Sequence, residues 1–188
     1  MLKTLDIHGS AGTSADGSQS MLILKEHDGD RLLPVLMSSR RAFFCMMRSQ
    51  FDLPIPLPIS VADIAVQMMA TGHMSLKSVE LTALNNGLFF CRMHVSDAQG
   101  EEHEVDFCQA SDGITLAAAA RCPVTIDEEL LEAQYLRPTG EHSFAMSLNL
   151  FSRGMLEQAL ATAVAEENYE AASKLRDELA RRPKEEED

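Results

Sequence analysis

Two histidines, His94 and His103, have a spacing in this sequence that could support metal binding. If Ala98 and Gln99 form the tip of a turn, the two imidazoles stand directly opposite each other across a pair of antiparallel strands. Zinc sites usually need a third protein ligand, and no third residue joins this pair. We therefore interpret the two histidines as a cross-strand pair on the surface of a sheet.

The four cysteines occupy positions with no CxxC spacing, at Cys45, Cys91, Cys108 and Cys122. Nothing in this spacing indicates a disulfide framework, and no base is paired with Cys108 in sequence, so we propose no thiol nucleophile. The thiols are expected to be small, buried, apolar groups in a reducing cytoplasm. The N-terminal residues contain no apolar stretch of signal-peptide length, and no segment has the length of a membrane span.

The basic residues are few, and their only N-terminal cluster is Arg40, Arg41 and Arg48. This cluster could bind a phosphate, although such residues more often form the solvated face of a helix. The net charge of −13 argues against binding nucleic acid through a broad basic surface. It does not exclude a nuclease, because acidic residues can hold a metal ion that meets the phosphate.

The first third of the chain predicts strands, a helix and an extended proline-rich connector. They are expected at residues 2–7, 21–25, 31–37, 38–49 and 54–58. A loop is expected at residues 9–17, which are rich in Gly and Ser. Asp28 and Gly29 predict a tight hairpin turn, in which the glycine supplies a positive φ angle.

The next part of the chain predicts a second set of strands between helices. They are expected at residues 60–72 (helix), 76–84, 88–95 and 102–107 (strands), 111–120 (helix), 122–126 (strand) and 127–133 (helix). Ser60 and Asp63 approximate a capping box at the first of these helices. Asn86 and Gly87 are typical of a two-residue hairpin turn. The fold class is therefore α+β, a mostly antiparallel sheet with helices packed on it.

The C-terminal part predicts an antiparallel helical hairpin on a linker. We expect a domain at residues 1–136, a linker at 137–152, the hairpin at 153–182 and a disordered acidic tail at 183–188. Two helices of this length are rarely stable alone. The hairpin therefore needs a further partner, which could be its own domain, a second copy of the chain or another protein.

Residues 167–179 resemble the UVR motif, which is named for bacterial excision-repair subunits. The resemblance implies that the hairpin mediates protein–protein contact. The partner-binding residues that it implies are Tyr169, Ala172, Leu175, Arg176 and Leu179. An ordinary amphipathic hairpin used for dimerisation would present nearly the same surface.

Residues 2–136 resemble the bifunctional nuclease family, described as acting on both DNA and RNA. The matching segments are 33–36, 58–60, 111–114 and 122–124. The pairing of this domain with a C-terminal UVR hairpin is itself found in the family. The resemblance implies a homodimer and hydrolysis of phosphodiesters with Mg²⁺ or Mn²⁺.

The candidate site residues lie in or beside the segments that match the family, and Ser111 and Asp112 are the two that keep its pattern. Asp112, Ser111 and Asp63 are the candidate catalytic residues, and Asp112, Asp106 and Asp63 are the candidate metal ligands. Each also has a structural interpretation. Asp63 completes a capping box, Ser111 caps a helix whose first turn contains Asp112, and Asp106 faces solvent on an edge strand.

Four polar residues of the family pattern, a histidine, two acids and an arginine, are missing from this sequence. The family's His-Asp pair falls on Val61 and Ala62, and its first Asp and its Arg in the later motif fall on Phe107 and Gln109. Two functions from different classes therefore stay open. One is a metal-dependent nuclease with weak or lost activity, and the other is a non-catalytic dimeric scaffold that presents the hairpin to a partner.

Overall fold

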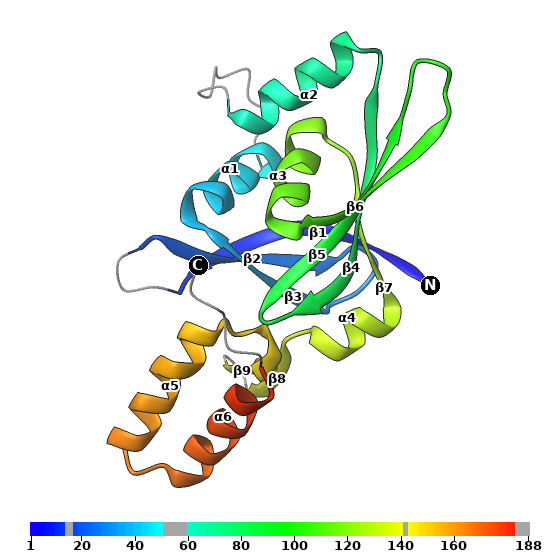
Figure 1. Ribbon diagram of the computed structural model, residues 1–188. Helices are drawn as coiled ribbons and strands as arrows, with labels where there is room; N and C mark the ends of the chain where they lie inside the picture. The colour runs from blue at the N-terminus through cyan, green and yellow to red at the C-terminus, as the bar shows by residue number, and fades with distance from the viewer. Residues whose placement is uncertain (14–16, 51–59, 141–142, 183–188) are drawn as a thin grey trace.

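The residues that the computed structural model describes, 1–13, 17–50, 60–140 and 143–182, form a seven-stranded sheet, a two-stranded sheet and the helices around them (Figure 1). The order of the larger sheet is β3-β2-β1-β7-β4-β5-β6. Its neighbouring strands are antiparallel except for β4 and β7, which are parallel. The predicted α+β class, with its mostly antiparallel sheet and C-terminal helical hairpin, is confirmed.

The first half of the sheet is a three-stranded meander followed by a helix. Its elements are β1 (Leu2–Gly12), β2 (Gln19–Glu26), β3 (Leu32–Ser38) and α1 (Ser39–Gln50). The prediction that a loop begins at residue 9 is wrong, because β1 continues to Gly12 and pairs with β2 there. The ladder of backbone hydrogen bonds outweighs the low strand propensity of Gly and Ser in this segment.

The predicted turn between β2 and β3 is present, but the expected role of Gly29 is wrong. Gly29 is not one of the glycines with a positive φ angle. A Cβ atom at this position would instead collide with the carboxylate of Glu26. That carboxylate accepts hydrogen bonds from Arg31 at 2.8 and 2.9 Å. A larger residue at this position would therefore have to displace the Glu26 carboxylate from Arg31.

The second half of the sheet repeats the arrangement of a meander followed by a helix. Its elements are α2 (Val61–Thr71), β4 (Ser75–Asn85), β5 (Leu88–Ser96), β6 (Glu102–Gln109) and α3 (Ala110–Ala120). Asn86 and Gly87 have φ angles of 49° and 81° in the turn between β4 and β5, as the sequence predicts.

The two halves are joined by β7 (Val124–Asp127), which lies between β1 and β4. It runs antiparallel to β1 and parallel to β4, so a strand late in the sequence closes the middle of the sheet. The short helix α4 (Glu128–Gln134) follows at once. Its N-cap is Asp127, whose side chain accepts a hydrogen bond from the Glu129 amide at 2.8 Å.

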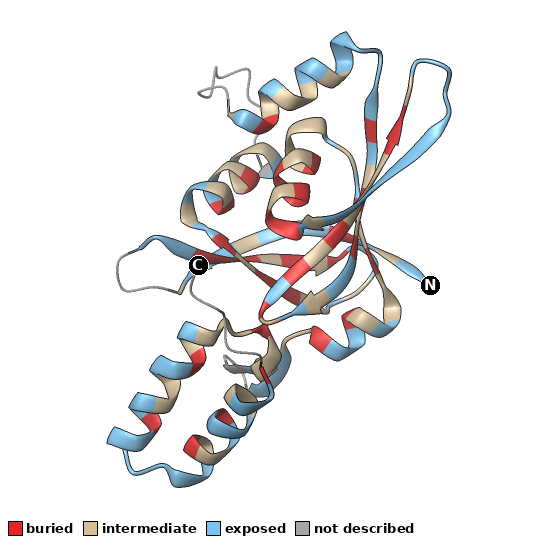
Figure 2. Ribbon diagram, viewed as in Figure 1, coloured by how far each residue is buried: buried red, intermediate tan, exposed pale blue. Residues whose placement is uncertain are grey.

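The main hydrophobic core lies between the sheet and the helices α1 and α3 (Figure 2). Leu22, Leu24, Val79 and Leu81 of the central strands are fully buried, as is Ile114 of α3. Burying each such side chain contributes roughly 1.5–3 kcal/mol. Helix α2 packs mainly on α3, so α1, α2 and α3 form a continuous layer over one face.

The C-terminal part begins with short elements and ends in the hairpin. They are β8 (Arg137–Gly140), β9 (Ser143–Ala145), the 3₁₀ helix η1 (Leu148–Leu150), α5 (Arg153–Ala165) and α6 (Tyr169–Arg181). The segment predicted as a linker thus contains β8, β9 and η1. The predicted connector at 54–58 and the tail at 183–188 lie outside the described residues. Among the described helices, none has the length and apolar character needed to cross a membrane.

Candidate functional site

The predicted acids Asp63 and Asp112 both lie against helix α1. Arg41 and Arg48 of this helix are seven residues apart, which is two helical turns, so they share one face. Arg41 reaches the start of α3 and Arg48 reaches the start of α2. Helix α1 therefore connects the two segments in which the sequence places the candidate catalytic residues.

Asp63 is engaged in helix capping and in an ion pair. Its carboxylate accepts hydrogen bonds from the backbone and the hydroxyl group of Ser60, both at 2.9 Å. The Asp63 amide donates to the Ser60 hydroxyl at 3.2 Å, which completes the predicted capping box. Arg48 Nη2 lies 2.6 Å from Asp63 Oδ1, and the acid's side chain is only 11% exposed. The carboxylate is thus neutralised and largely enclosed.

Ser111 and Asp112 both interact with Arg41 at the first turn of α3. Arg41 Nη2 lies 2.5 Å from Asp112 Oδ1, and Arg41 Nη1 donates to the Ser111 hydroxyl at 3.1 Å. The interpretation of Ser111 as the helix cap is wrong, because α3 begins at Ala110 and its N-cap is Gln109. Ser111 lies inside the first turn, where it is buried and serves as an acceptor for Arg41.

Asp106 lies apart from these helices on the edge strand β6. Its carboxylate accepts a hydrogen bond from Arg92 Nε of β5 at 2.6 Å. The predicted position on an edge strand is confirmed by the strand order. The pairing of β5 with β6 shifts register between Cys91 and Met93, so a β-bulge lies next to Asp106.

Each predicted metal ligand is therefore ion-paired with a different arginine. Among the residues that the structure describes, no group of three or more His, Cys, Asp and Glu side chains is placed to hold a metal ion. Arg41 and Arg48 do not form the solvated face that was the commoner interpretation of this cluster, because each binds an acid on another helix. A metal role for Asp63, Asp106 and Asp112 stays a prediction.

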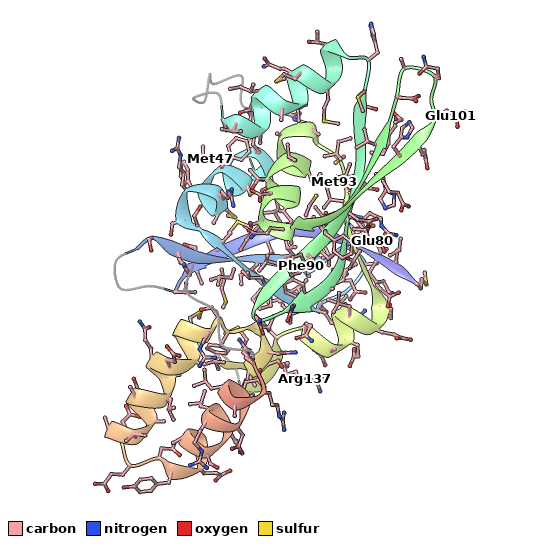
Figure 3. All side chains as sticks on the ribbon, viewed as in Figure 1. Met47, Glu80, Phe90, Met93, Glu101 and Arg137 are labelled. Carbon is pink, nitrogen blue, oxygen red and sulfur yellow. The ribbon has the colours of Figure 1, made fainter. Side chains whose placement is uncertain are left out.

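The two histidines do not lie opposite each other as predicted, because the register of β5 and β6 differs by one residue from the expected one. His94 lies opposite Glu104, and His103 lies opposite Val95. His94 instead sits between two carboxylates, with Glu80 at 3.3 Å and Glu104 at 3.7 Å. Figure 3 labels Glu80 on this charged face of the sheet.

His103 hydrogen-bonds Asp97 at 2.9 Å on the other face, and this bond is the main cause that lowers the pKa of the Asp97 carboxyl. Since neighbouring residues of a strand point to opposite faces, a slip of one residue separates the two imidazoles. The two histidines therefore cannot share a metal ion.

The thiols are poor nucleophiles at neutral pH. Burial raises the pKa of Cys45 and Cys122 to about 11 and that of Cys91 to about 12. Burial also raises the pKa of Cys108. Since the thiolate is the reactive form, none of these side chains has the environment of a catalytic cysteine.

The C-terminal hairpin has a small core of its own. Leu156 and Ala163 of α5 pack against Ala172 and Leu175 of α6, with Leu179 at the edge of this cluster. Three of the predicted partner-binding residues, Ala172, Leu175 and Leu179, thus hold the hairpin together. The other two, Tyr169 and Arg176, have exposed side chains.

The base of the hairpin is anchored to the rest of the chain. Arg182 follows α6 and donates hydrogen bonds to the carbonyl oxygens of Leu148, at 3.0 Å, and Phe151. The turn between β4 and β5 approaches the same segment, because a Cβ atom on Gly87 would lie 2.5 Å from the Phe151 carbonyl oxygen. The hairpin therefore contacts the sheet through the segment before α5.

A family model for the bifunctional nuclease domain matches residues 22–138. The chain belongs to the bifunctional nuclease domain family. A second family model, for the UvrB/uvrC motif, matches residues 156–181. Both predicted resemblances, and their order along the chain, are confirmed.

Two uncharacterized proteins of Mycobacterium tuberculosis are similar to this family member. They are MT1877 of strain CDC 1551 / Oshkosh and Rv1829 of strain ATCC 25618 / H37Rv, each 28% identical over 114 residues. The aligned part covers 61% of this chain and 65% of each relative. The similarity thus spans a little less than two thirds of the relatives' length.

Two of the departures from the bifunctional nuclease pattern are visible in the structure. Phe107 lies at the β-bulge with a φ angle of 58°, and it is 89% exposed. Gln109 is the N-cap of α3 and makes no side-chain capping bond. Where the resemblance places an acid and an arginine, this family member has an exposed aromatic ring and a neutral amide.

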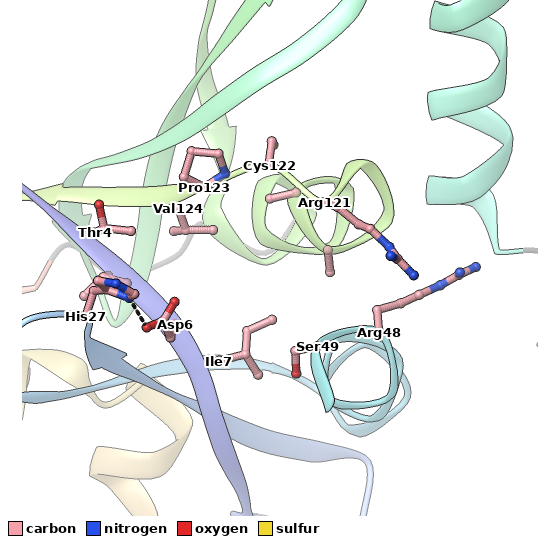
Figure 4. Close-up of a pocket in the computed structure, with 13 residues that line it drawn as sticks. Thr4, Asp6, Ile7, His27, Arg48, Ser49, Arg121, Cys122, Pro123 and Val124 are labelled. Atoms are coloured by element: carbon pink, nitrogen blue, oxygen red, sulfur yellow. Dashed lines mark hydrogen bonds and ion pairs between the residues drawn. The ribbon is translucent and has the colours of Figure 1, made fainter. Parts of the chain in front are cut away.

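No motif in the sequence predicts the crevice that Asp6, His27, Arg48 and Arg121 line (Figure 4). These residues come from four separate segments of the chain. Their proximity depends on the packing of α1 and α3 over β1, which no local motif encodes.

Proposed function

We propose that this bifunctional nuclease family member acts as an adaptor in which phosphodiester hydrolysis is weak or lost. The observation that carries this proposal is the pairing of every predicted site acid with an arginine. The N···O distances are 2.6 Å for Asp63, 2.6 Å for Asp106 and 2.5 Å for Asp112.

These ion pairs oppose metal binding in two ways. A carboxylate that accepts a guanidinium hydrogen bond has fewer lone pairs for a cation. The guanidinium itself also repels a divalent cation, by about 8 kcal/mol for charges of +1 and +2 that lie 4 Å apart at an effective dielectric constant of 20. A divalent ion would have to displace Arg41 from Asp112 before the acid could hold it.

The UVR-type hairpin is the proposed contact for a protein partner. Tyr169 and Arg176 project from α6, and Val164 of α5 is exposed as well. Tyr and Arg are enriched among residues that dominate the energetics of protein interfaces. Because Arg182 anchors the base of the hairpin, these side chains are held at a defined position relative to the nuclease-type domain.

A second copy of the chain is a further proposed partner, through helix α2. Val61, Ile64 and Met68 recur at helical spacing, and their exposed fractions are 83%, 47% and 69%. Such a stripe can pair with the same stripe of a second copy about a two-fold axis. A homodimer would thus bury apolar surface that the monomer leaves in water.

We propose the cytoplasm as the location of the protein. The cysteines Cys45, Cys91, Cys108 and Cys122 are all free thiols. Free thiols are typical of a reducing compartment.

A second candidate function is metal-dependent hydrolysis of DNA or RNA at the start of α3. It is supported by the convergence of Arg41, Ser111 and Asp112. Asp112 is 49% exposed, so it could exchange its arginine for Mg²⁺ or Mn²⁺ when a phosphate binds Arg41.

Cleavage assays distinguish the two functions. Purified full chain is incubated with single- and double-stranded DNA and with RNA, in Mg²⁺, Mn²⁺ or chelator. Asp112→Asn is the test variant, and Asp30→Asn is the matched control, because the Asp30 side chain is fully exposed in a surface turn. The adaptor proposal expects no metal-dependent cleavage above the Asp112→Asn background. Cleavage that Asp30→Asn keeps and Asp112→Asn loses would establish a nuclease instead.

A further inference from the structure

The strand β6 is the least covered part of the larger sheet. It is the last strand at its end of the sheet, and all of its residues are exposed except Cys108, which is half-buried. Figure 2 shows β6 in the colour of exposed residues, and in Figure 3 Glu101 lies at the tip of the β5–β6 hairpin, away from the helices. An edge strand with both faces in water is an open template for a further strand.

The register of β5 and β6 determines which backbone groups point to this open edge. The Asp97 amide donates to the Glu101 carbonyl oxygen at 3.0 Å. In an antiparallel ladder, hydrogen-bonded and non-hydrogen-bonded pairs alternate, so Glu102 and Glu104 form the non-hydrogen-bonded pairs with β5. The amide and carbonyl groups of Glu102 and Glu104 therefore point away from β5, toward the open edge.

The acids along β6 carry more negative charge than their neighbours balance. Glu102, Glu104 and Asp106 alternate along the strand and so point to one face. Arg92 of β5 lies 3.3 Å from Glu104 and 2.6 Å from Asp106, so one guanidinium group serves two acids. His94 lies 3.7 Å from Glu104 and adds a charge only when it is protonated. In the part of the chain that the structure describes, Glu102 has no ion-pair partner.

The opposite face of the edge is apolar where the regular pairing ends. Val105 points away from the carboxylates of Glu102 and Glu104, and its side chain is exposed. Phe107 follows at the β-bulge, where its side chain is exposed as well. A strand added along residues 102–105 would thus meet carboxylates on one face and apolar side chains on the other.

We propose that the edge of β6 binds an extended basic segment of another protein, which joins the sheet as a further strand. Lys or Arg side chains at alternate positions of this segment lie opposite Glu102 and Glu104, and the apolar residues between them lie beside Val105. Main-chain hydrogen bonds to the edge supply affinity, and the alternating side chains supply specificity. This contact uses neither the α5–α6 hairpin nor α2, so it goes beyond the adaptor function proposed above.

A second copy of the chain fits this edge poorly. If two β6 strands paired about a two-fold axis at Glu104, this residue would lie opposite its own copy. An axis at His103 would place Glu102 opposite Glu104. Like charges directly opposite each other destabilise a strand pair. The charge of the edge therefore favours a basic partner over pairing of β6 with itself.

The carboxylates also have a purely protective interpretation. Charged side chains on an edge strand prevent sheets from associating edge to edge. If this were the only role of Glu102 and Glu104, a basic peptide would show no saturable binding. The binding proposal makes a different prediction, because a cationic strand gains ion pairs where a neutral or acidic strand is repelled or left unpaired.

The test measures fluorescence anisotropy of a labelled seven-residue peptide in which lysine alternates with valine, titrated with the full chain at about 0.15 M salt. One comparison peptide has glutamate in place of lysine. The other carries N-methyl groups on the backbone amides of its lysines, which keeps the charge but removes the donors that face β6. This second peptide separates strand addition from simple attraction to a protein with a net charge of −13.

The test variant combines Glu102→Gln with Glu104→Gln. The matched control combines Glu129→Gln with Glu166→Gln, which removes the same charge at two exposed acids outside the sheet. We expect saturable binding of the lysine peptide, roughly fivefold weaker in the test variant and unchanged in the control. The N-methylated peptide should bind at least about tenfold more weakly than its parent.

Hydrogen exchange should show that the bound lysine peptide protects amides of residues 102–105. No saturable binding of the lysine peptide, equal binding of the N-methylated or the glutamate peptide, unchanged affinity in the test variant, or protection elsewhere without protection of β6 would each overturn the proposal.

Discussion

Replacement of Arg182 by Ala should release the base of the C-terminal hairpin. The Arg182 side chain is only 5% exposed and pairs with Glu178 of α6 at 2.9 Å. It also donates to the carbonyl oxygens of Leu148 and Phe151, which lie just before α5. One side chain therefore connects the end of α6 to the segment that carries the hairpin.

The size of the effect follows from these contacts. Each hydrogen bond to a charged group contributes roughly 1.5–3 kcal/mol. Alanine would remove two such bonds to carbonyl groups and leave Glu178, which is 18% exposed, without its cation. Allowing for water that enters the opened base, we expect the free energy of local opening to fall by about 3 kcal/mol. This corresponds to an increase of about 100-fold in the population of the open form.

Hydrogen exchange measured by mass spectrometry reports this opening segment by segment. In Arg182→Ala, amides of α5 and α6 should exchange about 100-fold faster, while those of β2 in the main core should keep their rates. The control is Arg176→Ala, whose side chain is 71% exposed and pairs with its neighbour Asp177 at 3.9 Å. Equal exchange of α6 in the parent chain and in Arg182→Ala would refute the idea that this contact anchors the hairpin.

Three other outcomes are expected. Gly87→Ala should lower the free energy of unfolding by about 1–3 kcal/mol more than Gly100→Ala does, as measured by thermal unfolding. Both glycines have positive φ angles, but only at Gly87 would the added Cβ atom collide with backbone, that of Phe151. Equal losses of stability in the two variants would contradict this contact. The hydrogen bond from Arg31 lowers the pKa of Glu26 below its ordinary value of 4.5. The stability that this ionised carboxylate contributes is thus present above pH 4.5 and is lost as the pH falls through the lowered pKa. In Glu26→Gln the free energy of unfolding, measured with urea, should therefore fall less steeply as the pH is lowered. Met68→Glu should lower the sedimentation coefficient from the value of a dimer to that of a monomer. A parent chain that sediments as a monomer would refute the proposed dimer contact through α2.

Local chemistry explains the elements that the sequence predicts well. Asn86 and Gly87 adopt the positive φ angles of a tight hairpin turn, and Ser60 with Asp63 forms the capping box. These signals depend on residues at most three positions apart. The N-cap at Asp127 is of the same kind, because its acceptor oxygen needs only the amide two residues later.

The strand register could not be predicted in the same way. The sequence placed the turn tip at residues 98–99, which pairs His94 with His103. In the structure the Asp97 amide donates to the Glu101 carbonyl, and Ser96 pairs with Glu102. The loop is one residue longer and includes Gly100 at a φ angle of 84°. That single residue moves every later cross-strand pair by one and sends the two histidines to opposite faces.

The partners of the candidate acids were also invisible to sequence reasoning. Arg48 and Asp63 are 15 positions apart and lie on different helices, and Arg41 meets Ser111 across 70 positions. These contacts depend on the packing of both α1 and α2 on α3. A composition with few basic residues could only show that arginines were available, and it could not show that each was already paired.

The arrangement of the whole chain separates the two proposed activities in space. Helices α1, α2 and α3 lie at one end of the molecule in Figure 1, and the hairpin α5–α6 lies at the other. The hairpin contacts the sheet at the β4–β5 turn through Gly87, which is remote from the start of α3. A protein bound to Tyr169 and Arg176 would therefore leave Asp112 uncovered. Partner binding should then leave a cleavage rate unchanged, unless it also displaces the segment that Arg182 holds.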